Sequence, residues 1–190
     1  RDIPIVITAV TDPVEAGLVK SIEEPGTNVT GTSDMNPVKE QFELIQELVP
    51  EAKNIGIIYN AAEPNSVVQV DLAKTIAHSL GMEILEATVA NTSEVNQAAQ
   101  NLVDRVDVIY APTDNAVASS ISAILKVADQ AKIPVIPGER ALVDAGALAT
   151  WGIDYFSLGT QTGNIAARIL QGEDPKQIPI EFSHNLKLVV

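Results

Sequence analysis

Residues 54–89 read NIGIIYNAAEPNSVVQVDLAKTIAHSLGMEILEATV, and this stretch indicates the fold class most directly. An apolar run and a polar turn lead into a long segment with Pro64 at its start and Gly81 just past its end, and a second apolar run follows. Proline in the first turn and glycine after the last turn are typical of a helix. The stretch therefore predicts a strand, a helix and a second strand, the unit from which parallel sheets are built.

The same alternation of strand-like and helix-like segments continues on both sides of residues 54–89. Further strands are predicted at residues 3–10, 107–111, 133–136 and 147–150, with two short strand-like runs in 178–190. Further helices are predicted at residues 13–22, 37–49, 115–132, 140–145 and 155–170, and in a segment capped by Thr92 or Ser93 that ends near 103. This order predicts an α/β fold with a doubly wound parallel sheet, and residues 34–153 form its main lobe.

The composition fits this fold class and narrows the range of partners. Hydrophobic residues make up 46% of the chain and aromatic residues only 4%, so aliphatic side chains must fill the core. The formal net charge of −13 repels phosphates and anionic membrane surfaces, so no nucleic acid is expected as a partner. The absence of cysteine excludes disulfides and thiolate metal sites. No apolar run approaches the ~20 residues that span a bilayer.

Polar residues follow the predicted strands at the points where the strands end. In an open parallel sheet, ligands bind beyond the carboxyl ends of the strands, where the loops lead into helices. Helix N-termini at these loops present free N–H groups that favour a carboxylate or a similar anion. The loops that converge on this edge are residues 10–13, 60–63, 112–115, 137–140 and 151–155. The sequence thus predicts a binding site for a small charged molecule at this edge.

The loops hold the groups that the zwitterion of an amino acid requires. The hydroxyls of Thr11 and Thr113, together with backbone N–H groups, suit an α-carboxylate. The carboxylates of Asp114 and Asp154 suit an α-ammonium group. Because these groups lie on several loops that share one edge, the set points to a ligand more strongly than any single member does.

Helix capping is the alternative interpretation of the same side chains. The residues that stand where helices need caps in any case are Asp12, Thr113, Asp114 and Asn115. Taken singly, each of them is explained more simply as a cap than as a ligand contact. For Asp154 we favour ligand binding, because it follows a buried strand and Gly152 leaves room for close approach to the backbone.

Aromatic side chains near these loops offer a wall for a planar ligand. Trp151 and Tyr155 stand in the last of the loops, where each can either stack against a ligand or pack in the core. For Trp151 the two interpretations stay equally open. Tyr59 and Tyr110 lie inside predicted strands and are expected in the core.

The sequence gives little support for catalysis. Its two histidines, His78 and His184, do not stand at the ends of predicted strands, where a general base would be expected. The chain contains no nucleophile elbow, no phosphate-binding loop and no dinucleotide fingerprint. We therefore expect no enzymatic activity, no catalytic residue, no metal and no cofactor.

Several motifs at the same loops carry a resemblance to a known family. They are IPIVITAVTDPVEAGLV (3–19), PGTNVTG (25–31), IIYN (57–60), APTDNAV (111–117) and GALATWGIDY (146–155). In these motifs the chain resembles the ABC-transporter substrate-binding proteins of the tryptophan/tyrosine-uptake type. The resemblance spans essentially the whole chain, and the motifs recur in order at matching separations.

The resemblance implies a type I periplasmic-binding fold, in which two Rossmann-like lobes clamp a ligand in the cleft at their hinge. It implies an extracytoplasmic protein, held at the membrane only by a lipid anchor outside this chain, that delivers an amino acid to an ABC permease. Tryptophan, tyrosine or phenylalanine is the implied ligand. The implied ligand-binding residues are Thr11, Asp12, Asn60, Thr113, Asp114, Asn115, Asp154 and Tyr155.

The chain departs from the family in one respect. Members carry roughly one further small domain before the equivalent of Ile3, so most of the N-terminal lobe is expected to be missing here. Residues 1–33 are then the end of the N-terminal lobe with the crossover, 34–153 the C-terminal Rossmann-like lobe, and 154–190 the return helix with the terminal strands. The alternative to solute capture for import is a ligand-sensing regulatory or receptor domain of the same fold.

Overall fold

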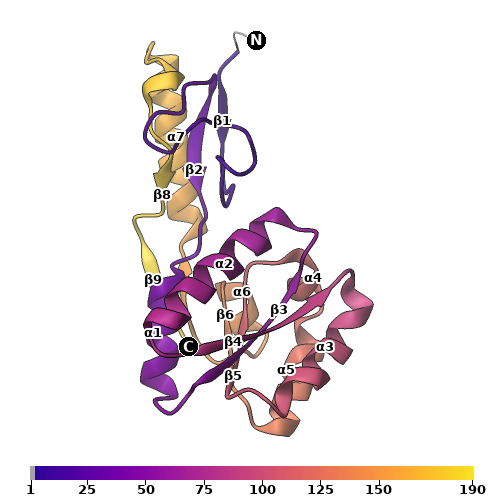
Figure 1. Ribbon diagram of the computed structural model, residues 1–190. Helices are drawn as coiled ribbons and strands as arrows, with labels where there is room; N and C mark the ends of the chain where they lie inside the picture. Colours follow the sequence, from indigo (N-terminus) through magenta and orange to yellow (C-terminus); the bar gives the residue numbers. More distant parts are fainter. Residues whose placement is uncertain (1–2) are drawn as a thin grey trace. The chain divides into compact units, whose positions relative to one another are not determined.

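The parallel sheet predicted from residues 54–89 lies at the centre of the larger of two units (Figure 1). Figure 1 is a computed structural model that describes residues 3–190. Unit 1 consists of the chain up to Met35 with Ile153–Leu186, and unit 2 of Asn36–Gly152 with Lys187–Val190. The assignment of residues 1–33, 34–153 and 154–190 to the lobes of a larger protein stays a prediction.

The central sheet of unit 2 has four strands in the order β4-β3-β5-β6, and all its pairings are parallel. The strands are β3 (Asn54–Asn60), β4 (Glu83–Val89), β5 (Val108–Ala111) and β6 (Val135–Pro137). The α-helices around them are α1 (Val38–Leu48), α2 (Pro64–Ser79), α3 (Val95–Val103), α4 (Asn115–Ser119), α5 (Ile121–Ala131) and α6 (Arg140–Asp144). This arrangement confirms the predicted α/β class with a doubly wound parallel sheet.

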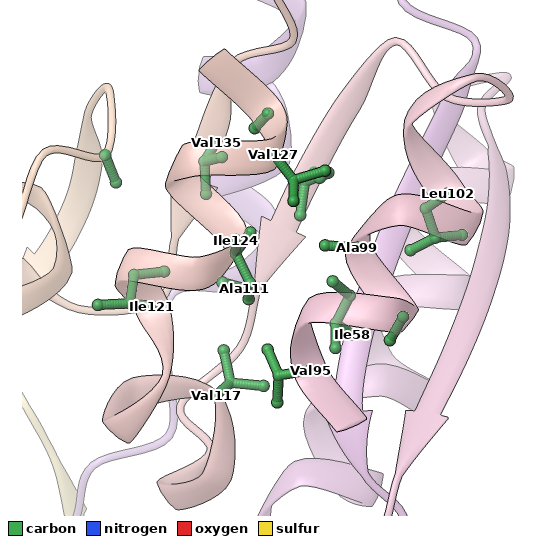
Figure 2. Close-up of a cluster of buried hydrophobic side chains, with 14 of the residues drawn as sticks. Ile58, Val95, Ala99, Leu102, Ala111, Val117, Ile121, Ile124, Val127 and Val135 are labelled. Carbon is green, nitrogen blue, oxygen red and sulfur yellow. The ribbon is translucent and has the colours of Figure 1, made fainter. Parts of the chain in front are cut away.

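Alternate residues of β3 supply the cores on the two faces of this sheet. Ile55, Ile57 and Tyr59 pack in one cluster with apolar side chains of α1 and α2. Ile58 packs on the opposite face with side chains of α3, α4 and α5 (Figure 2). Tyr110 of β5 is fully buried in the first cluster, so the expectation that Tyr59 and Tyr110 belong to the core is confirmed.

Unit 1 contains a smaller parallel sheet with the order β1-β2-β8. Its elements are β1 (Ile5–Ile7), β2 (Val29–Ser33), α7 (Tyr155–Leu170), the 3-10 helix η2 (Pro175–Gln177) and β8 (Glu181–Phe182). Helix α7 packs against β1 and β2. The buried apolar cluster of this unit is Val19, Val29 and Ile180, with partly buried neighbours around it.

Two predictions near the N-terminus differ from the structure, since the strand is shorter than predicted and the helix does not form. The strand predicted over 3–10 is confined to β1, and the helix predicted over 13–22 is a series of turns. A single helical turn begins where the N–H of Ala16 donates to the carbonyl of Asp12 (3.0 Å). Gly17 then adopts a φ of 67°, which a continuing helix does not allow, so the turn stops there. Pro13 favours the first turn of a helix, but it does not ensure that further turns follow.

The next strand, β2, was not predicted, because its sequence Val-Thr-Gly-Thr-Ser is mostly polar. All five of its residues are nevertheless buried. Gly31 of β2 has a φ of 143°, and a Cβ there would overlap the carbonyl oxygen of Ile7 on β1. Glycine is thus required for β1 and β2 to pair in register.

Other differences concern where elements begin and end. The helix predicted over 115–132 is divided into α4 and α5, because Ser120 (φ −123°, ψ 13°) leaves helical geometry. The cap predicted at Thr92 or Ser93 is Asn91, whose side chain accepts from Ser93 N–H at the 3-10 helix η1 (Thr92–Glu94). The strand predicted at 147–150 is displaced to β7 (Thr150–Ile153), which pairs with β9 (Leu186–Val189). Over residues 3–190, no helix is both long enough and apolar enough to cross a membrane.

Candidate ligand-binding site

The side chain of Asp114 forms hydrogen bonds near the carboxyl ends of β3 and β5 in unit 2. This side chain is almost completely buried, with an exposed fraction of 1%. The N–H of Val117 donates to Oδ1 (2.9 Å), which makes Asp114 the N-cap of α4. Oδ2 accepts from the N–H of Asn60 (2.7 Å) and from Ser66 Oγ (2.7 Å). One carboxylate therefore ties the end of β3 to the starts of α2 and α4.

Glu63 holds the two asparagines of the predicted site. Asn115 donates to Glu63 Oε2 through its backbone N–H (3.1 Å) and its side-chain Nδ2 (2.6 Å). Asn60 Nδ2 donates to Oε1 (3.2 Å). Partial burial acts to raise the pKa of Glu63, but the hydrogen bonds from Asn115 and Asn60 outweigh it and hold that pKa below its ordinary value. The loops after β3 and β5 are thus fastened by an anionic side chain.

Thr113 lies in a layer of buried amides. Asn36 Nδ2 donates to Thr113 Oγ1 (2.6 Å) and to Gln69 Oε1 (2.6 Å). Gln69 also accepts from the backbone N–H of Thr113 (3.2 Å) and donates to its carbonyl (3.1 Å). Since the hydroxyl oxygen of Thr113 accepts from Asn36, its hydrogen is directed elsewhere and can donate.

Gln41 forms a second buried polar centre beside this layer. Its Nε2 donates to the carbonyls of Gly138 (3.1 Å) and Trp151 (2.8 Å), and its Oε1 accepts from Tyr110 OH (2.7 Å). Burial raises the pKa of Tyr110, so the phenol stays protonated and donates. A Cβ at Gly138 would overlap Asn36 Nδ2, which explains the glycine there. The Trp151 side chain is half-buried, and its contact with a ligand stays a prediction.

Unit 1 brings two of the predicted residues together at a carboxylate. Thr11 Oγ1 donates to Asp34 Oδ1 (3.1 Å), and Tyr155 OH donates to Asp34 Oδ2 (3.2 Å). Asp34 directly follows β2 and has an exposed fraction of 8%. Thr11 follows β1 and Tyr155 begins α7, so three elements meet at this side chain.

The other two predicted residues of unit 1 accept hydrogen bonds from nearby backbone N–H groups. Oδ1 of Asp12 accepts from backbone N–H groups of Val14 (2.9 Å) and Glu15 (3.0 Å). Asp154 is the N-cap of α7, and its Oδ1 accepts from two N–H groups of the first helical turn (3.2 and 3.3 Å). Contact of either side chain with a ligand stays a prediction.

The structure therefore groups the predicted residues in two sets. Unit 2 brings together Asn60, Thr113, Asp114 and Asn115, and unit 1 brings together Thr11 and Tyr155. The polar residues that sequence reasoning missed are Asp34, Asn36, Gln41, Glu63, Ser66 and Gln69. For Gln41 a signal existed, since it stands in the apolar stripe of α1 between Val38 and Phe42. Among residues 3–190, no three His, Asp or Glu side chains are grouped as a metal ion would require.

Comparison with known proteins places this arrangement in a family. The sequence model of the ABC transporter substrate binding protein family matches residues 1–190. The chain is 47% identical over 190 residues to a tyrosine-binding protein of Clostridioides difficile (strain R20291), covering all of this chain and 55% of that protein.

Two solved structures show the same likeness. One is the ABC domain in complex with L-Trp from Streptococcus pneumonia (36% identity, TM-score 0.91). The other is the ligand-free, open structure of a substrate binding protein with adhesive properties from Clostridium difficile (48% identity, TM-score 0.84). Each comparison covers 100% of this chain and 64% of the other. The chain thus spans less than two thirds of the length of each of these three relatives.

More distant structures share the fold alone. A LacI family transcriptional regulator from Bifidobacterium animalis subsp. lactis matches with 15% identity and a TM-score of 0.67. At this identity the likeness says nothing about function. Together with the solved structures of higher identity, it confirms the predicted type I periplasmic-binding fold.

Proposed function

Since this chain belongs to the family of ABC transporter substrate-binding proteins, we propose that it binds an aromatic amino acid for import. The observation that carries the proposal is the 47% identity, over the whole chain, to a tyrosine-binding protein. The related domain in complex with L-Trp supports the same class of ligand. Tryptophan, tyrosine and phenylalanine are the proposed ligands.

The geometry of the loops supports a small zwitterionic ligand. In unit 2, hydrogen bonds donated to the carboxylates of Asp114 and Glu63 fix the loops after β3 and β5, so the polar groups there are held before a ligand arrives. Preorganised polar groups cost less ordering on binding, which favours affinity. The residues proposed to bind the ligand are Thr11, Asp12, Asn60, Thr113, Asp114, Asn115, Asp154 and Tyr155.

The proposed role of the protein is to deliver its ligand to a transporter. Following the family resemblance, the ligand binds in the interlobe cleft of an extracytoplasmic protein and is handed to an ABC permease. A lipid anchor outside this chain is the proposed link to the membrane. The formal net charge of −13 opposes binding to nucleic acid, which favours transport over a DNA-binding regulator as the setting of this fold. The ligand is released unchanged.

A ligand screen tests the proposal. The complete gene product that contains these residues is heated with each of the twenty amino acids, and calorimetry then measures the dissociation constant of each one that raises the melting temperature. A ligand at about 100 times its dissociation constant should stabilise the protein by roughly 2.7 kcal/mol. Mass spectrometry of the recovered ligand checks that it is unaltered.

The screen has a clear negative outcome. We expect tryptophan, tyrosine or phenylalanine to stabilise the protein, with alanine and glutamate as small and charged controls. Failure of all three aromatic amino acids, together with stabilisation by a sugar or a peptide, would contradict the proposed ligand class.

A further inference from the structure

The carboxylate of Asp34 is the buried acid of unit 1 whose partners were not predicted. Its exposed fraction is 8%, and it lies directly after β2, at the carboxyl edge of the sheet β1-β2-β8. Ligands of parallel sheets bind beyond this edge. Thr11 and Tyr155, two residues proposed to bind the ligand, both donate to it, at 3.1 and 3.2 Å.

Neither of these donors carries a charge. Within residues 3–190, the ion pairs of the protein involve other carboxylates, and none includes Asp34. A buried carboxylate is costly unless a cation or several hydrogen bonds compensate it. Each carboxylate oxygen can accept two hydrogen bonds, so one donor on each oxygen leaves capacity for another. An ammonium group offers up to three N–H donors and a full positive charge.

Asp114 and Asp154, the two acids predicted to bind an α-ammonium group, accept hydrogen bonds from other groups of the protein. Asp114 accepts hydrogen bonds from Val117, Asn60 and Ser66, and it braces loops of unit 2. Asp154 caps α7 through two backbone N–H groups. Asp34 differs from both, because Asp114 and Asp154 accept from fixed backbone N–H groups, whereas Thr11 and Tyr155 donate to Asp34 through hydroxyl groups that can rotate as a ligand binds.

We propose that the carboxylate of Asp34 accepts hydrogen bonds from the α-ammonium group of the bound amino acid. The hydroxyls of Thr11 and Tyr155 hold this Asp34 carboxylate in place. The inference rests on the proposed function and names the residue that selects for the amino group. Asp34 is thereby a specificity-determining residue, and Thr11 and Tyr155 are its positioning residues.

The test compares two ligands that differ in the ammonium group. Calorimetry measures the dissociation constants of L-tryptophan and of indolepropionate, which lacks the amino group, for the complete gene product. The wild type should bind tryptophan at least about 30-fold more tightly than indolepropionate. Asp34→Asn keeps the shape of the side chain, and it should weaken tryptophan binding by about 30-fold or more. Its affinity for indolepropionate should stay within about threefold, so that the discrimination nearly disappears.

Asp174→Asn is the matched control. Asp174 lies in unit 1, caps η2 and follows the opposite end of α7 from Tyr155. The 16 residues of α7 separate the two ends by about 24 Å. This variant removes the same charge and should leave both dissociation constants unchanged, which separates a direct contact from a change in overall charge. Melting temperatures of all variants show whether each is folded, and Asp34→Ser replaces Asp34→Asn if the latter is not.

The outcomes distinguish this inference from the proposed function. A wild type that binds no amino acid overturns both. A wild type that binds tryptophan and indolepropionate equally tightly overturns this inference, whatever the variants do. So does an Asp34→Asn protein that retains the wild-type discrimination. Loss of discrimination in Asp34→Asn, with Asp174→Asn unchanged, supports the assignment.

Discussion

Buried polar side chains determine the shape of the loops at the scale of single residues. Asp114 accepts hydrogen bonds from three groups, which lie at the end of β3, at the start of α2 and within α4. The side chains of Gln41 and Gln69 likewise form hydrogen bonds with neighbouring backbone groups. Buried backbone groups have no access to water and need hydrogen-bond partners within the protein. Each of these side chains supplies such partners.

Asp114→Ala should lower the free energy of unfolding by about 2–4 kcal/mol. The change removes the cap of α4 and leaves the N–H of Asn60 and the hydroxyl of Ser66 without their acceptor. Urea denaturation followed by circular dichroism measures the loss. Asp174→Ala, which removes an exposed cap, is the control and should cost no more than about 1 kcal/mol. Equal losses for the two variants would mean that burial of Asp114 adds nothing.

Asp107 should make stability depend on pH. Backbone N–H groups of Asn54 (2.8 Å) and Lys53 (2.9 Å) donate to its Oδ2 and hold the pKa of Asp107 below its ordinary value. A lowered pKa in the folded state stabilises the protein above the unfolded-state pKa of about 3.9, and this contribution is lost as pH falls through the folded value.

Asp107→Asn should therefore be less stable than the wild type near neutral pH by about 1 kcal/mol, since the site is exposed and screened. The difference should shrink steadily once the pH falls below about 4. Urea denaturation across this pH range measures it. Asp104→Asn removes a neighbouring exposed charge as a control. A difference between wild type and Asp107→Asn that stays constant with pH would contradict the prediction.

Single glycines decide the pairing and the ends of elements. Gly31 lets β2 approach β1 closely, whereas Gly17 ends the first helical turn of the N-terminal segment. At Gly31 the absence of a Cβ makes the close approach possible, whereas at Gly17 the effect comes from a backbone conformation that glycine adopts readily. Gly159 lies within α7, where a Cβ would meet no atom of the described chain within 4 Å apart from its chain neighbours and the backbone of its own helix.

Gly31→Ala and Gly159→Ala should have opposite effects on unit 1. At Gly31 the new Cβ would overlap the backbone of Ile7, and the φ of 143° is unfavourable for alanine. We expect a loss of about 3 kcal/mol in the free energy of unfolding. At Gly159 alanine favours the helix and should add up to about 1 kcal/mol. Thermal and urea denaturation of both variants test this, and a stable Gly31→Ala protein would show that the β1–β2 register is not what the glycine protects.

The two units of the whole molecule differ in the size of their cores. Unit 2 has an extensive apolar cluster on each face of its sheet. Figure 2 shows the cluster on the face covered by α3, α4 and α5. Among the described residues of unit 1, the buried cluster is smaller and consists of Val19, Val29 and Ile180. Leu158, Ile165 and Ile178 are buried in this unit as well. Since buried apolar area is the main source of stability, unit 1 should open more readily than unit 2.

Hydrogen exchange followed by mass spectrometry tests this difference. Amides of β1 and β2 should exchange faster than those of β3 and β5 in the isolated chain. The comparison uses peptides from the middle of each strand, so that fraying at strand ends does not contribute. Equal protection in both sheets would show that the small cluster of unit 1 does not limit its stability.

The fold class and the family could both be predicted from the order of residues alone. Strand and helix patterns around residues 54–89 depend on local preferences and on periodicity, which are written directly in the order of residues. The prediction of the parallel sheet was therefore confirmed, and so was the resemblance carried by the motifs at the loops. The prediction of strands from the sequence failed at β2, whose polar residues give no strand signal although all of them are buried.

Which polar groups contact one another became known from the packing of the folded chain. Asp34 and Tyr155 are 121 positions apart in the chain, and Asn36 and Thr113 are 77 apart. No local pattern encodes such pairs, because they form only when separate strands and helices bring their ends to one edge of a sheet. The positions of the loops followed from the sequence, whereas the partners within them followed from packing.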